Sequence, residues 1–195
     1  MISERIQAVM ICIMFFFGCA ERKPPPSNSL SLYWDQLEKT KSNDASTSNP
    51  EILEKAFLQF KDFYKVYSKD IIERDLRKLY AQNAYFRDPF NEVEGIDAIE
   101  KHFLASADTI DSCVFDIEEP VMSGHDVYCR WIMHLQLKRD KTKEITQTLG
   151  MSHVRFSNAG EIVFHVDYWD PSIAVYEKIP VLKRLVQFVR KRVSN

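Results

Sequence analysis

Ionisable side chains that could transfer a proton gather near the carboxyl end, in the segment FHVDYWDP (residues 164–171). If this segment is a strand, its side chains alternate, and His165 and Asp167 share one face with Val163 and Trp169. A neutral imidazole beside a carboxylate in apolar surroundings can act as a general base with its orienting acid. A buried histidine–aspartate hydrogen bond that merely satisfies both groups has the same spacing. The segment therefore predicts either a catalytic pair or a structural one.

Asp88 is a second candidate carboxylate, which follows two aromatic residues and precedes a proline. The stretch YFRDPF (85–90) places it at the end of a short strand, where it could serve as a base or a second acid, or hold a substrate. Aspartate before proline also forms turns, because its side chain accepts hydrogen bonds from nearby backbone N–H groups. A catalytic role and a turn-forming role are both open for Asp88.

The remaining motifs and the charge balance exclude several classes of function. His134 and His153 fall on the middle strands, away from the apolar set that includes Trp131 and Met133, and could face each other there. The chain has no H-x-H, C-x-x-C or H-E-x-x-H spacing, so no metal site is predicted. It also lacks the glycine-rich nucleotide loops and the G-x-S-x-G motif, so no cofactor is predicted. A net charge of −2 gives no support for binding nucleic acid.

Hydrophobic periodicity predicts the elements that position these residues. Apolar side chains recur every three to four positions in three segments, which predicts helices at about 50–67, 70–80 and 95–105. Short strands are expected at 84–87 and 90–94. Period-two alternation then predicts longer strands at 112–118, 127–138, 144–156 and 162–169. Helices followed by a meander of strands indicate an α+β domain with helices on one face of a curved sheet.

Two cysteines, Cys113 and Cys129, lie on strands that are expected to form a hairpin closed near residue 122. Antiparallel register about that point matches Cys113 with residue 132. The two cysteines are then about three residues out of line, which is too far for a disulfide of good geometry. We therefore expect two buried free thiols.

The chain resembles SnoaL-like members of the nuclear transport factor 2 superfamily. The resemblance rests on LYAQNAYFRDPFNEVEGIDAIEKHF (79–103) and SHVRFSNAGEIVFHVDYWDP (152–171), and it covers about residues 51–178. It implies a cone-shaped α+β fold: a curved antiparallel or mixed sheet with three N-terminal helices on its concave face and a C-terminal helix. Members include ketosteroid isomerase and polyketide cyclases as well as pockets without known chemistry, so fold does not decide function.

What the resemblance implies for the site is a cone that holds an apolar small molecule. The family pattern has a polar residue of the last strand reaching inward, which favours His165 and Asp167 as the proton-transfer pair, with Asp88 as a further acid. Isomerisation, hydration and cyclisation are the implied reaction classes; the alternative is a non-catalytic domain that binds a ligand or a partner protein. Family members often pair through the outer sheet face, so a homodimer is expected. The implied pocket wall, or core, comprises Trp131, Met133, Tyr80, Trp169 and Phe86.

The ends of the chain predict where the protein is found. Residues 1–19 read as a signal peptide whose end, Phe-Phe-Gly-Cys, resembles the box of bacterial lipoproteins, with Cys19 as the lipidated residue. Residues 20–50 read as a flexible tether, although the stretch 30–38 is apolar enough to form a turn of helix or dock on the domain. A lipid-anchored protein of the bacterial cell envelope is therefore predicted; the alternatives are a secreted, periplasmic or cytoplasmic protein.

The carboxyl end, residues 179–195, predicts a basic amphipathic helix that starts at Pro180. Its apolar stripe is flanked by five basic residues, Lys183, Arg184, Arg190, Lys191 and Arg192. Such a helix can lie on an anionic membrane surface. It can equally cap the cone or form a dimer seam, with its basic face in solvent.

Overall fold

The computed structural model describes residues 30–41, 49–140 and 142–193. The chain divides into two compact units, Met1–Asp35 and Gln36–Asn195. In the first unit the described residues begin helix α2 (Ser31–Lys39), where the rings of Tyr33 and Trp34 meet edge to face with centroids 5.0 Å apart. The predicted signal peptide, Cys19 and most of the predicted tether lie outside the described residues, but residues 31–39 of that tether are helical.

Three helices precede and interrupt the strands of the second unit, close to the predicted bounds: α3 (Pro50–Lys65), α4 (Lys69–Leu79) and α5 (Ile96–Ala107). The side chain of Asn49 caps α3 by accepting a hydrogen bond from the Glu51 backbone N–H at 3.0 Å. The hydroxyl of Ser68 caps α4 in the same way. Gly95 precedes α5 with a φ of 88°, a conformation that favours glycine because other side chains are strained there.

The strands form one mixed sheet in the order β2-β1-β7-β6-β5-β3, with β4 paired to β5. Their bounds are β1 (Tyr80–Arg87), β2 (Glu92–Glu94), β3 (Ile110–Ile117), β4 (Val121–Ser123), β5 (Asp126–Leu137), β6 (Thr146–Phe156) and β7 (Ile162–Trp169). Strands β1 and β7 are parallel, while every other pair is antiparallel. The predicted α+β fold with a curved sheet is confirmed.

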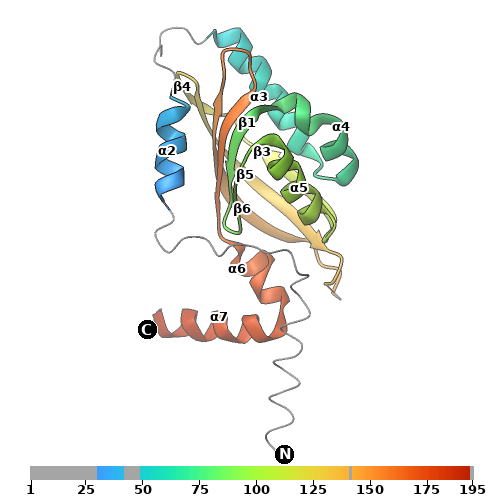
Figure 1. Cartoon of the computed structure of the whole chain (residues 1–195). Helices are drawn as coiled ribbons and strands as arrows, with labels where there is room; N and C mark the ends of the chain where they lie inside the picture. The colour runs from blue at the N-terminus through green and yellow to red at the C-terminus, as the bar shows by residue number, and fades with distance from the viewer. Residues whose placement is uncertain (1–29, 42–48, 141, 194–195) are drawn as a thin grey trace, which may run out of the picture. The chain divides into compact units, whose positions relative to one another are not determined.

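Helices α3, α4 and α5 lie along one face of the sheet (Figure 1), and the main core fills the space between them. The apolar stripe of α3 supplies much of it: Leu53, Ala56, Phe57, Phe60, Phe63 and Tyr64 are all buried. Burial of each leucine or phenylalanine in this set contributes about 1.5–3 kcal/mol of transfer free energy. The helix periodicity in the sequence therefore identified the buried face of α3.

A second apolar cluster brings the carboxyl-terminal segment against the sheet. This segment comprises α6 (Pro171–Ala174), the 3₁₀ turn η1 (Tyr176–Lys178) and α7 (Pro180–Val193). Ala174 of α6 is buried in a cluster with Cys113, Trp131, Met133 and Leu135. An ion pair from Lys178 to Asp140, at 2.8 Å, fastens η1 to the loop after β5. No described residue of α7 is buried.

The register of the β3–β5 pair differs from the predicted one. Cys113 lies opposite Leu135 rather than residue 132, because the hairpin turns at Gly124 and the short strand β4 lengthens it. Cys113 and Cys129 are therefore further out of line than expected. Both thiols are free and buried, as predicted. None of the described helices is long and apolar enough to cross a membrane.

Candidate functional site

His165 and Asp167 of β7 point to the concave side of the sheet and are bonded to each other. The His165 Nε2 to Asp167 Oδ1 distance is 2.9 Å. His165 is fully buried, and the rings of Phe60 and Phe86 meet its imidazole edge-on at centroid distances of 5.5 and 5.1 Å. The Asp167 side chain is 18% exposed. Of the two groups, the carboxylate is the one that a molecule from solvent can reach.

Two buried tyrosines continue the hydrogen bonds behind His165. The Tyr80 hydroxyl lies 2.6 Å from His165 Nδ1, and the Tyr64 hydroxyl lies 2.8 Å from that of Tyr80. Burial raises the pKa of both phenols well above the ordinary value. The two tyrosines therefore stay protonated and keep their hydrogen-bond donors at neutral pH.

On its other side Asp167 is held by a second chain of donors. The Ser152 hydroxyl donates to Asp167 Oδ1 at 2.5 Å, and the Trp131 indole N–H donates to Ser152 Oγ at 2.9 Å. The indole lies over Gly150, its partner across β5 and β6, and a Cβ on Gly150 would come within 2.3 Å of the ring. Glycine at this position is what allows Trp131 to reach Ser152.

Donor and acceptor chemistry gives these bonds one consistent direction. An indole can only donate and an ionised carboxylate can only accept, so both chains end at Asp167. In the tautomer whose Nε2–H donates to Asp167 and whose Nδ1 accepts, Tyr80 donates to His165 and accepts from Tyr64, which also lies 3.5 Å from Nδ1. Among the described residues, every hydrogen bond to Asp167 reaches Oδ1. The arrangement leaves Oδ2 to accept a proton or a hydrogen bond from a ligand.

Asp88 is placed elsewhere, at the turn between β1 and β2. Its Oδ1 accepts hydrogen bonds from the backbone N–H groups of Phe90 and Asn91, both at 2.7 Å, and Oδ2 is bonded to His102 Nε2 at 3.0 Å. Both oxygens are thus engaged, and the geometry is that of the turn-forming alternative. The structure does not join Asp88 to the hydrogen-bonded group around Asp167.

The five predicted pocket-wall residues lie in the two apolar clusters. Tyr80 and Phe86 belong to the main core, Trp131 and Met133 to the second cluster, and Trp169 packs against the second cluster. Tyr80 and Trp131 also take part in the hydrogen bonds described above. On β7, a β-bulge leaves Val163 without a partner on β6. Val163 packs against the main core and also lines a pocket that does not include His165.

The structure separates His134 and His153, which were expected to face each other. His134 lies opposite Gln147 and is bonded to Asp116, whereas His153 lies opposite Tyr128. His153 is also buried, because its ring stacks on Tyr128 at 4.4 Å and its Nε2 bonds to Asp126 Oδ1 at 2.8 Å. Across residues 30–41, 49–140 and 142–193, no group of three or more His, Cys, Asp or Glu side chains is arranged to hold a metal ion.

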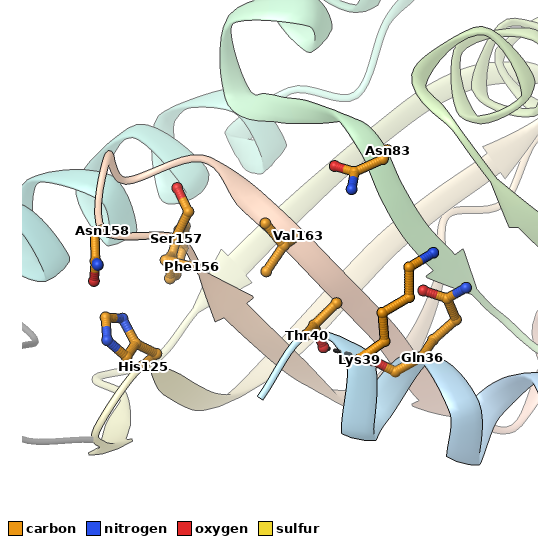
Figure 2. A pocket seen from close by; sticks show the side chains of 9 residues that line it. All are labelled: Gln36, Lys39, Thr40, Asn83, His125, Phe156, Ser157, Asn158 and Val163. Atoms are coloured by element: carbon orange, nitrogen blue, oxygen red, sulfur yellow. Dashed lines mark hydrogen bonds between the residues drawn. The ribbon is translucent and has the colours of Figure 1, made fainter. Parts of the chain in front are cut away.

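A pocket of about 200 Å³ lies away from Asp167, beside the carboxyl end of α2 (Figure 2). Its lining residues are Gln36, Lys39, Thr40, Asn83, His125, Phe156, Ser157, Asn158 and Val163. None of the predicted pocket-wall residues is among them. Its residues, of which Phe156 and Val163 are apolar, are scattered over the chain, so no motif in the sequence indicated it.

Sequence reasoning also missed Ser152 and Tyr64 as members of the hydrogen-bonded group. Tyr64 was assigned only to the apolar stripe of α3. Ser152 lies opposite Asp167 in the β6–β7 pair. The turn at Asn158–Gly160 would have predicted that pairing to within one residue, so hairpin register was the available signal.

Comparison with protein families places the chain by its sequence. The model of the SnoaL-like domain matches residues 60–165, which is more than half of the 195 residues. The protein therefore belongs to the SnoaL-like family. No curated protein sequence matches the chain.

Solved structures share the fold at low identity. An NTF2-like protein of unknown function from Exiguobacterium sp. 255-15 is 17% identical, with a TM-score of 0.51 over 59% of this chain and 98% of that one. A protein with a ketosteroid isomerase-like fold from Catenulispora acidiphila, solved with trimethylamine, is 16% identical, with a TM-score of 0.52 over 64% and 89%. A protein from Shewanella denitrificans OS-217, provisionally assigned as a SnoaL-like polyketide cyclase, is 18% identical, with a TM-score of 0.51 over 65% and 95%.

Proposed function

We propose that the protein binds an apolar small molecule on the concave side of its sheet and that Asp167 exchanges a proton with it. The observation that carries this proposal is the meeting of two donor chains at Oδ1 of a partly exposed carboxylate. A general base needs to be held in one orientation while an oxygen stays free for the proton, and the bonds to Asp167 provide both.

His165 acts as a positioning residue in this proposal. It is fully buried, so it does not touch a ligand without rearrangement. Its Nε2–H fixes Asp167, and Tyr80 in turn fixes the imidazole. Ser152 supports the carboxylate from the other side. This reverses the sequence-based assignment, in which the imidazole was the base and the carboxylate oriented it.

The reaction classes supported are those in which one carboxylate takes a proton and returns it, namely isomerisation, hydration and cyclisation. Membership of the SnoaL-like family supports a small-molecule pocket. The solved structure provisionally assigned as a polyketide cyclase is consistent with this set, although its identity is too low for residue roles to be transferred.

Proton exchange with a bound compound tests the proposal directly. Native mass spectrometry of the purified protein identifies a compound that co-purifies, and that compound is then incubated with the protein in D₂O. We expect the wild type to introduce deuterium into it, and Asp167→Asn to retain the compound but lose at least a hundredfold of the exchange rate, as is typical for a general base. Equal exchange by both proteins would refute the role of Asp167.

A non-catalytic binding domain is the second candidate, and one observation favours it. Each side chain from Trp131 to Tyr64 in the hydrogen-bonded group is bonded to another member, which is also how a stable core satisfies its polar side chains. In that case wild type and Asp167→Asn both retain the compound and neither exchanges its hydrogens.

We also propose that the protein works at a membrane, through a lipid on Cys19 and through α7. The apolar residues Leu185, Phe188 and Val189 of α7 are each more than half exposed, and basic residues flank them. Attraction of these basic groups to anionic lipid would add to burial of the apolar stripe.

Two measurements test the membrane proposal. Cys19→Ser is expected to move the protein from the membrane to the soluble fraction, with loss of the acyl mass on the first mature peptide. The Arg184→Glu/Lys191→Glu variant is expected to bind phosphatidylglycerol vesicles at least tenfold more weakly than wild type does. Equal binding to phosphatidylcholine and phosphatidylglycerol vesicles would contradict the electrostatic part.

A homodimer through the outer face of the sheet is the third part of the proposal. The face exposes an apolar strip on neighbouring strands, which comprises Ile132, Leu149 and Met151. Covering such a strip by a second copy would bury apolar surface. Light scattering after size exclusion should show a dimer for the wild type and a monomer for Leu149→Lys.

A further inference from the structure

The pocket beside α2 shares no lining residue with the hydrogen-bonded group around Asp167. Its walls come from the end of α2, from β1, and from the β4–β5 and β6–β7 turns. Figure 2 shows Gln36 and Lys39 at one end of the group of side chains and His125 with Asn158 at the other. The site is therefore separate from the proposed proton-transfer site, and the two can be tested independently.

Two polar atoms in this pocket are buried without a partner. Gln36 and His125 are 4% and 8% exposed, and Gln36 Oε1 and His125 Nε2 make no hydrogen bond with any described residue. The one other buried side-chain atom of the described residues that lacks a hydrogen bond, Asp140 Oδ2, has an ion-pair partner in Lys178 at 2.8 Å. A buried polar group without a partner costs about 1–3 kcal/mol. Both atoms are closed to solvent, so each gains a partner from a polar molecule in the pocket when its side chain turns towards that molecule.

The chemistry of the lining defines that molecule. Amides from Gln36, Asn83 and Asn158 and the Ser157 hydroxyl supply uncharged donors and acceptors. The Thr40 hydroxyl already donates to the Gln36 carbonyl at 2.6 Å, and Phe156 and Val163 add apolar surface. Lys39 is the only charged lining residue, and Glu94 already neutralises it at 3.0 Å. Ligand hydroxyl groups both donate and accept, so they satisfy the imidazole and the amide in either orientation.

We infer that this pocket binds a small, uncharged, polyhydroxylated molecule of the size of a monosaccharide or a cyclic polyol. Its volume of about 200 Å³ corresponds to roughly seven water molecules at ~30 Å³ each. That is smaller than the ~300–1,000 Å³ of sites for drug-sized ligands.

The wall contributed by α2 is fixed before any ligand arrives. Arg155 donates from Nη1 to the Leu37 carbonyl at 2.6 Å and to Thr40 Oγ1 at 3.0 Å. Asp126 holds the same guanidinium by bonds to Nε and Nη2. A wall held in place in this way lowers the ordering cost of binding.

A titration followed by ¹H–¹⁵N NMR on the full chain tests the inference, with D-glucose, D-galactose and myo-inositol as probes. We expect at least one probe to shift the side-chain amide signals of Gln36, Asn83 and Asn158. Gln36→Leu is expected to weaken that binding about tenfold, which is the loss of one hydrogen bond of ~1.4 kcal/mol. Gln59→Leu, the same change at an exposed position of α3, is the matched control and should leave the affinity unchanged.

Several results would overturn the inference. Absence of shifts with all three probes makes the pocket a water site. Binding of acetate or phosphate in place of the probes, lost in Lys39→Met, makes it an anion site. His125→Phe provides the second variant if Gln36→Leu unfolds, and unchanged binding in whichever variant folds would show that the probe binds elsewhere.

Discussion

Asp167 and Asp126 are both held by a histidine, on opposite faces of one sheet, but their second oxygens differ. Asp126 accepts from His153 and Arg155 at Oδ1, and again from Arg155 at Oδ2. Asp167 uses Oδ1 alone among the described residues. A carboxylate bonded at both oxygens stabilises the fold, whereas a carboxylate with one unbonded oxygen can also accept a hydrogen bond or a proton from a ligand.

The hydrogen bonds to Asp126 predict a pH-dependent contribution to stability. Burial on its own would raise the pKa of Asp126, but the bonds from His153 and Arg155 outweigh it and lower the pKa to about 2. Because the folded-state pKa lies below the ordinary value of 3.8, this contribution is present above pH 4 and is lost as the pH falls towards 2. We expect Asp126→Asn to cost about 2 kcal/mol at pH 6.

Urea unfolding of the wild type and Asp126→Asn, repeated from pH 6 down to pH 2.5, measures this contribution. The difference between their free energies of unfolding should shrink with falling pH. A difference that stays constant over that range would show that the carboxylate is not the titrating group responsible.

The hydrogen bonds of Tyr80, on the concave side, give a second prediction for a single residue. Tyr80→Phe keeps the ring but removes the hydroxyl to which both His165 Nδ1 and Tyr64 bond, which leaves them only their direct contact at 3.5 Å. We expect a loss of about 1–3 kcal/mol in the free energy of unfolding, measured in urea. Tyr176→Phe is the control, since the ring contact of Tyr176 with Phe90 is kept. A loss no larger than that of the control would contradict the hydrogen-bonded chain.

Among the elements, the close approach of β5 and β6 at Trp131 and Gly150 is the most constrained point near the site. A methyl group on Gly150 would overlap the indole, so Gly150→Ala must move Trp131 away from Ser152. We expect a cost of about 1–3 kcal/mol, as for other overpacked cores. Urea unfolding measures the cost, and near-ultraviolet circular dichroism should show a changed tryptophan environment.

Gly124→Ala separates this steric effect from a general effect of losing a glycine. Gly124 has a φ of 59° and no atom within 4 Å of an added Cβ. Its substitution should cost about 1–2 kcal/mol of backbone strain. The tryptophan spectrum should not change. The same spectral change in both variants would show that Gly150 has no special relation to Trp131.

Local patterns predicted the elements better than their register. The apolar spacing of α3 and the alternation in β7 gave both elements, and the shared face of His165 and Asp167, from the sequence. The start of β1 at Tyr80 was missed, because a bulge between Tyr80 and Tyr85 breaks the alternation. Bulges and hairpin register depend on which strands pair, and no single segment contains that information.

At the candidate site, too, local patterns predicted some features, and the others depend on how the elements pack. Alternation placed His165 and Asp167 together. Burial by Phe60 and Phe86, which come from other elements, decides that the carboxylate and not the imidazole is open to solvent. The buried position of His153 likewise depends on its pairing with Tyr128. Exposure is a property of the packed elements, so the sequence named the residues and left their roles open.

For the domain as a whole, α6 contributes a buried side chain to the second apolar cluster. Ala174 is almost fully buried there beside Cys113 and Trp131, and Lys178 fastens the following turn to Asp140. Trp131 also belongs to the hydrogen-bonded group around Asp167. We therefore expect the position of α6 to control solvent access to the part of the concave side next to Asp167.

Cysteine reactivity tests this control, because the chain has one buried thiol in each cluster. Burial raises the pKa of Cys113 and of Cys129 to about 12, so both react slowly with a maleimide in the wild type. Ala174→Asp places a charge in the second cluster and should displace α6. We expect labelling of Cys113, read by peptide mass spectrometry, to become at least tenfold faster, while Cys129 in the main core stays protected. Equal acceleration at both cysteines would mean that the variant unfolds the domain; no acceleration at Cys113 would mean that another segment closes the concave side.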